Sequence, residues 1–221
     1  MKQLMHLKSD AQHWGSLAKF FHWTIVLLIL VQGTVGLVMV SLPKKPSIIP
    51  IYTFHKSVGI SILALAVLRL AWRLFDPHPD YPAKMPRWQV YAAKVTHALL
   101  YALIFLVPLS GWWYDSVSAL RPLYWFGLVE VPHLVAPDPA LKEFAADCHE
   151  FLFWTLILIA AGHATMALVH QFIDRDGLFS RMWPGRRALA NDAASAISQA
   201  TPSPSATPTP SPSAPQENAD A

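Results

Sequence analysis

The sequence predicts an all-α membrane protein, a bundle of four transmembrane helices. Of its 221 residues, 53% are hydrophobic and only 14% are charged, whereas a typical soluble domain has roughly 25% charged residues. Four windows of about 20 residues carry few or no charges, which is the length needed to cross a hydrocarbon core roughly 30 Å thick. Proline-rich connections separate these windows.

The first span is expected at residues 17–42, which are uncharged from Trp23 onward. A cleaved signal peptide is the alternative, because three lysines precede or enter this segment. The apolar region of a signal is only about 7 to 15 residues long, however, and Val40-Ser41-Leu42-Pro43 lacks a small-x-small cleavage site. We therefore expect a retained helix.

The other spans are expected at residues 51–75, 88–114 and 141–173, with Pro108 as a helix kink. These spans define a transmembrane domain at residues 17–187, preceded by a short cytoplasmic segment at residues 1–16. Residues 188–221 are rich in Ala, Ser, Thr and Pro. Such a composition buries too little apolar surface to offset the entropy of ordering, so a disordered tail is expected.

Lysine and arginine predict the orientation. Twelve of the 17 lie at the termini or beside the second connection, and five lie in the first and third connections. Because cytoplasmic connections carry an excess of these residues, both termini are expected in the cytoplasm. The basic residues form no patch or stripe, which argues against nucleic-acid binding.

The histidines are the residues that indicate most about function. Six of the ten lie in or at the edge of the expected spans, where polar side chains are costly and usually functional. These six are His22, His55, His97, His149, His163 and His170.

Helix geometry sorts four of these histidines into pairs. His149 and His163 are 14 residues apart on the fourth span, hence about 40° from a common face and about 21 Å apart in depth. His55 lies at the depth of His149, and His22 at the depth of His163. The expected ligand pairs are therefore His55 with His149 and His22 with His163.

Two imidazoles facing each other across a bundle suit the axial positions of haem iron. Zinc would need its ligands to converge on one point, which is impossible for ligands about 21 Å apart. The single cysteine, Cys148, and the absence of Cys-x-x-Cys-His exclude covalent c-type attachment. We therefore expect two haem b groups.

The same 14-residue offset places small or charged residues at the haem levels. Gly36 follows His22 and Gly111 follows His97 by this offset, so neither position has a side chain to obstruct a macrocycle. Arg69 follows His55 by the same offset and could pair with a haem propionate. Close helix packing is the alternative for the glycines, and snorkelling to the membrane surface is the alternative for Arg69.

Several short motifs in this order resemble the bacterial cytochrome b561 family over residues 14–187. They are Phe21-His22-Trp23, Phe54-His55-Lys56-Ser57-Val58-Gly59-Ile60, His97 with Leu100-Tyr101, Pro108-Leu109-Ser110-Gly111, Cys148-His149-Glu150, His163, and His170-Gln171-Phe172. The resemblance implies a four-helix bundle in the bacterial inner membrane with two haem b groups. It also implies His22, His55, His149 and His163 as iron ligands.

The resemblance further implies electron transfer to ubiquinone, with superoxide as a possible periplasmic donor. His97, Arg69 and His170 are then expected around a quinone headgroup, to which His can supply protons, or around haem propionates. One alternative is a cytochrome b subunit that anchors a periplasmic hydrogenase or dehydrogenase. A second is a haem-free, histidine-lined cation transporter.

Overall fold

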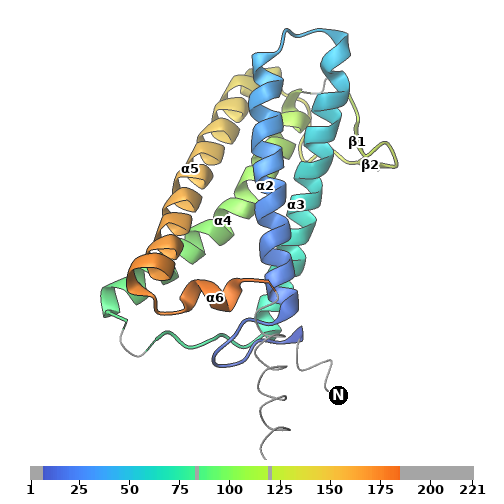
Figure 1. Ribbon diagram of the computed structural model, residues 1–221. Helices are drawn as coiled ribbons and strands as arrows, with labels where there is room; N and C mark the ends of the chain where they lie inside the picture. The colour runs from blue at the N-terminus through green and yellow to red at the C-terminus, as the bar shows by residue number, and fades with distance from the viewer. Residues whose placement is uncertain (1–6, 83–84, 119–120, 185–221) are drawn as a thin grey trace, which may run out of the picture. The chain divides into compact units, whose positions relative to one another are not determined.

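The computed structural model describes residues 7–82, 85–118 and 121–184, and it contains four long helices (Figure 1). They are α2 (Ser16–Ser41), α3 (Ile49–Phe75), α4 (Arg87–Ser118) and α5 (Lys142–Val169). All four are long and apolar enough to cross a membrane. The predicted fold class is therefore confirmed, and each expected span coincides with one helix to within a few residues.

The helices pack in chain order, with α2 against α3, α3 against α4, and α4 against α5. Their contacts leave many large apolar side chains exposed, among them Leu27, Leu68 and Leu158. Exposed leucines along a whole helix are unfavourable in water but favourable in lipid. This surface and the four apolar helices together make the chain a multi-pass membrane protein.

One end of the bundle, here called the terminal end, holds the start of α2, the end of α3 and the short helix α6 (Leu178–Met182). Ser9 donates hydrogen bonds from its backbone nitrogen and its hydroxyl to the carboxylate of Asp76, at 2.8 and 2.6 Å. Trp23 on α2 donates to the carbonyl of Met182 at 2.9 Å. The segment before α2 and the segment after α5 are thereby fastened to the same end of the bundle.

The opposite end, here called the hairpin end, carries a structure that the sequence did not predict. A two-stranded antiparallel hairpin, β1 (Leu123–Trp125) and β2 (Val129–Val131), lies in the connection from α4 to α5.

Short 3₁₀ turns at Pro46–Ile48 and Pro139–Leu141 lead into α3 and α5. α5 continues into a π-helical turn (His170–Asp174) at the terminal end. The proposed tail at residues 188–221 lies outside the described residues.

Candidate functional site

Near the hairpin end, His55 on α3 faces His149 on α5. Their ring centres are 6.3 Å apart, and the ring planes are nearly perpendicular. Two metal–imidazole bonds of about 2 Å, with roughly 1 Å from each nitrogen to its ring centre, would separate the rings by about 6 Å. The bundle therefore holds this pair at a spacing that suits one iron between the rings.

Hydrogen bonds orient His149. Its Nδ1 lies 3.0 Å from the carbonyl oxygen of Val107 and 3.0 Å from Oγ of Ser110. The Ser110 hydroxyl donates to the same carbonyl at 2.8 Å. Because the carbonyl can only accept, it favours the tautomer with the proton on Nδ1, which leaves Nε2 free to bind a metal.

Two glycines lie against these rings, as their positions in the sequence suggested. A Cβ atom at Gly36 would lie 3.2 Å from Cε1 of His55, and one at Gly111 would lie 3.0 Å from Cε1 of His149. The Nδ1 atom of His55 is buried and has no hydrogen-bond partner among the described residues. An unpaired buried imidazole backed by a glycine is costly as ordinary packing but suits a metal ligand, so these residues fit haem.

A partly buried ion pair lies next to this site. Lys56, which follows His55, pairs with Asp115 of α4, and the second carboxylate oxygen of Asp115 has no hydrogen-bond partner in the part of the chain that the structure describes. Lys56 is thus held by a protein carboxylate. Its charge is therefore less available to attract an anion than that of an unpaired lysine.

Toward the terminal end, three histidines and one arginine gather. The rings of His97 and His163 are centred 5.2 Å apart. His22 lies near both of these histidines, and its Nδ1 is 3.4 Å from Nη2 of Arg69. The guanidinium of Arg69 also lies over the ring of Tyr101, 5.2 Å from its centre. Each of the four long helices therefore contributes one member to this cluster.

The predicted partner of His163 was His22, but the closest ring pair in this cluster is His97 with His163. Depth along a helix can be counted from sequence, whereas the side on which a neighbouring helix presents its histidine cannot. The structure thus offers His163 two possible partners at one level.

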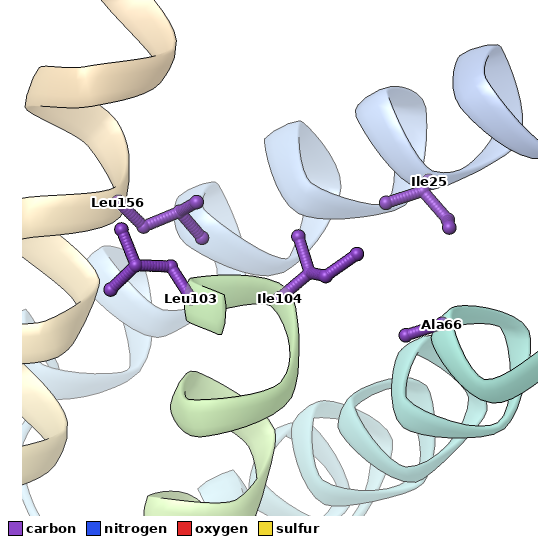
Figure 2. Packing of buried hydrophobic residues seen from close by; sticks show 5 residues of the cluster. All are labelled: Ile25, Ala66, Leu103, Ile104 and Leu156. Carbon is purple, nitrogen blue, oxygen red and sulfur yellow. The ribbon is translucent and has the colours of Figure 1, made fainter. Parts of the chain in front are cut away.

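An apolar layer separates the two histidine groups. Figure 2 shows Ile25 of α2, Ala66 of α3, Leu103 and Ile104 of α4, and Leu156 of α5 packed together. Leu156 is seven residues from His149 and seven from His163, hence about 10 Å from each along α5. The two groups are therefore separate sites at different depths of the bundle and do not form one metal cluster.

His170 lies apart, at the start of the π-helical turn. It is buried, and its Nδ1 lies 2.7 Å from Oδ2 of Asp176 and 3.2 Å from Oδ2 of Asp174. Asp176 also accepts a hydrogen bond from the backbone of Leu178 at the start of α6. Sequence reasoning missed both carboxylates, although they follow His170 by only four and six residues.

Comparison with known proteins agrees with this geometry. A sequence model of the prokaryotic cytochrome b561 family matches residues 13–185. The chain is 31% identical over 186 residues to cytochrome b561 homolog 2 of Escherichia coli K12, covering 80% of this chain and 95% of the relative.

The chain also matches two further relatives over nearly their whole length. Cytochrome b561 homolog 1 of Escherichia coli K12 is 27% identical, over 76% of this chain and 95% of the relative. A Yersinia pestis protein named "Probable superoxide oxidase CybB" is 28% identical, over 83% of this chain and 99% of the relative. The chain therefore belongs to the prokaryotic cytochrome b561 family, membrane proteins of four transmembrane helices whose cofactor is haem b.

Proposed function

We propose that this chain is a dihaem cytochrome b that carries electrons across the bacterial inner membrane, from a periplasmic donor to ubiquinone. The observation that carries the proposal is the presence of two histidine groups at different depths of one bundle, separated by an apolar layer. One group alone would suffice for a single redox centre. Two groups provide a path across the membrane.

The proposed ligands near the hairpin end are His55 and His149, and those near the terminal end are His22 and His163. When bound, haem b supplies a one-electron redox couple at each level. Ligation by two histidines would leave no open position on iron, so donor and acceptor would exchange electrons at a haem edge. Val107 and Ser110 hold His149 in the required tautomer, and Gly36 and Gly111 leave space beside the rings.

The proposed orientation places the terminal end in the cytoplasm and the hairpin end in the periplasm. The distribution of lysine and arginine supports this orientation. The site near the terminal end then faces the side that supplies protons for quinone reduction.

We place the quinone headgroup near His97, Arg69 and His170. Arg69 and the imidazoles offer hydrogen-bond donors to quinone oxygens or haem propionates. Asp174 and Asp176 hold Nδ1 of His170, at 3.2 and 2.7 Å. The second ring nitrogen of His170 can then donate a hydrogen bond, and a proton, to a reduced quinone.

Superoxide is the proposed donor, and the name of the Yersinia pestis relative supports it. Two superoxide ions give up one electron each and leave as dioxygen, while one ubiquinone takes up two electrons and two protons to form ubiquinol. Lys44, Lys45 and Arg121 lie in the connections at the hairpin end, and Lys142 begins α5 there; these cations could attract the anion. Lys56 contributes less because of its pairing with Asp115.

The test supplies superoxide and a water-soluble ubiquinone analogue to the purified protein. We expect ubiquinol to form at half the rate of superoxide consumption. In His170→Ala, haem reduction by superoxide should persist while ubiquinol formation falls by about tenfold or more, as is typical of losing a positioned proton donor. His133→Ala, which removes an exposed histidine of the third connection, is the control.

Two results would contradict parts of the proposal. No haem reduction by superoxide would reject superoxide as donor. Unchanged ubiquinol formation in both His170→Ala and His97→Ala would reject the quinone site. A large soluble subunit that co-purifies with the chain would instead favour the anchor function, and a colourless protein would favour the transporter.

A further inference from the structure

The hairpin of β1 and β2 exposes apolar side chains that neither the haem sites nor the proposed electron transfer uses. Leu128 is 75% exposed, Val129 58% and Phe126 47%, and Tyr124 and Trp125 lie beside them. Two isolated strands of three residues are not stable in water by themselves. The hairpin must therefore be held by other parts of the molecule.

Two serines of α3 hold the hairpin in place. Oγ of Ser57 accepts a hydrogen bond from the backbone nitrogen of Phe126 at 2.9 Å. The indole nitrogen of Trp125 donates to Oγ of Ser61 at 3.0 Å. Leu123 is buried, so one strand is fixed to α3 while the turn is left outward.

The turn itself is strained. Phe126 has a φ of 48°, a left-handed conformation that bulky residues rarely adopt, and Gly127 follows with a φ of 73°. The ring of Phe126 packs against Phe54 of α3, with 6.4 Å between ring centres. Phe54 also lines an apolar groove between α2 and α3, so the apolar surface of the hairpin continues onto the wall of the bundle.

The serines also show how deep the hairpin lies. Ser57 is eight residues inside the start of α3, hence about 12 Å below its end. From Ser57 to Asp76, just past the other end of α3, the helical rise is about 28 Å, close to the thickness of the hydrocarbon core. The charged pair of Lys56 and Asp115 lies at the same level. Figure 1 shows the hairpin beside α3 and not above the ends of the helices.

We propose that the hairpin is a lateral membrane anchor, whose turn enters the boundary between lipid headgroups and acyl chains in the leaflet at the hairpin end. Exposed Trp, Tyr and apolar side chains at this depth are typical of that boundary. The hydrogen bonds to α3 then set the depth of the bundle. His55, two residues before Ser57 and so nearer the start of α3, is held at the aqueous edge of the hydrocarbon core, where a water-soluble donor reaches the site without entering lipid. This proposal rests on the membrane fold and does not depend on the identity of the donor.

The test places an environment-sensitive fluorophore at Leu128→Cys in a Cys148→Ala background. The protein is reconstituted into vesicles of phosphatidylethanolamine and phosphatidylglycerol, with haem absorbance as the check of folding. We expect a spin label near the head of the acyl chain to quench the fluorophore at least about threefold more than aqueous iodide does, as for side chains at the interface. Ala136→Cys, in the same connection, should show the reverse preference. Leu158→Cys, on the exposed face of α5, should respond best to a spin label near the chain end.

A second measurement uses the unmodified chain. A lipid that carries a photoactivated carbene precursor near its glycerol should label residues 124–129 more than residues 133–138. Iodide quenching at Leu128 equal to that at Ala136 would overturn the proposal, because the turn would lie in water. Protection from both iodide and lipid quenchers, or crosslinking of the turn to a second chain, would also overturn it in favour of a protein partner.

Discussion

The two histidine groups differ in what surrounds them. Near the hairpin end, His55 and His149 are accompanied by two glycines and by hydrogen bonds that orient one ring. Near the terminal end, three histidines share one level with Arg69, and His170 lies beyond them between two carboxylates. The first group is a ligand pair, and the charges beside it, Lys56 and Asp115, pair with each other. The second has Arg69 in contact with one of its imidazoles and a third histidine at the same level, as a site that couples electron transfer to protonation would need.

The largest effect is expected from removing a ligand of the simpler group. His55→Ala leaves His149 without a partner, so the haem near the hairpin end should be lost while the other remains. The haem-to-protein ratio, measured after extraction, should fall from about two to about one, since one of two bis-histidine sites is destroyed. His133→Ala should keep both haems. Two full haems in His55→Ala would show that the pairing is wrong.

A smaller change at the same level tests the glycines. A Cβ at position 111 would lie 3.0 Å from the ring of His149, so Gly111→Ala should displace this imidazole and weaken one haem. The low-spin absorption of that haem should diminish, while the spectrum of the other stays unchanged. Gly162→Ala is the matched control, because a Cβ there meets no atom within 4 Å. Equal spectra for both variants would mean that Gly111 serves only helix packing.

The hydrogen bond that Nδ1 of His149 donates to Ser110 should have a modest effect on the redox potential. Removing one acceptor from Nδ1 of His149 makes the imidazole a weaker donor to iron and so destabilises the oxidised form. A hydrogen bond of about 1 kcal/mol corresponds to about 40 mV for one electron, so Ser110→Ala should raise one of two midpoint potentials by about that amount. Ser110→Thr should restore it. If both midpoint potentials shifted, or neither did, the proposed role of Ser110 in orienting His149 would be contradicted.

The smallest effect concerns the terminal end. His78 packs against Trp14, with 6.0 Å between ring centres, and Arg73 lies over the same indole. Burial, with Arg73 nearby, lowers the pKa of His78 below its ordinary value of 6.5. The unfolded chain therefore binds this proton first, and the folded state loses stability as pH falls below about 6.5. Thermal unfolding followed by haem absorbance should depend less on pH between about 7 and 5 in His78→Gln. An unchanged pH profile would contradict this.

The fold was largely predictable because a transmembrane helix can be recognised from the hydropathy of one continuous segment of the sequence. All four helices matched expected spans, and the family resemblance was confirmed. The hairpin was not predictable, because its strands have three residues each and depend on Ser57 and Ser61, more than 60 residues earlier in the chain. Depth counting brought His55 and His149 together, but it could not reveal that His97 approaches His163 most closely. That distance depends on how α4 is rotated and tilted, which no local pattern encodes.

The central claim is that one bundle holds two separate haem b sites. A redox titration of the purified wild-type protein, combined with its haem-to-protein ratio, tests this claim most directly. We expect two haems per chain that titrate with two distinct midpoint potentials, because one site is flanked by Arg69 and a third imidazole, His97, and the other is not. One haem per chain, or none, would contradict the account.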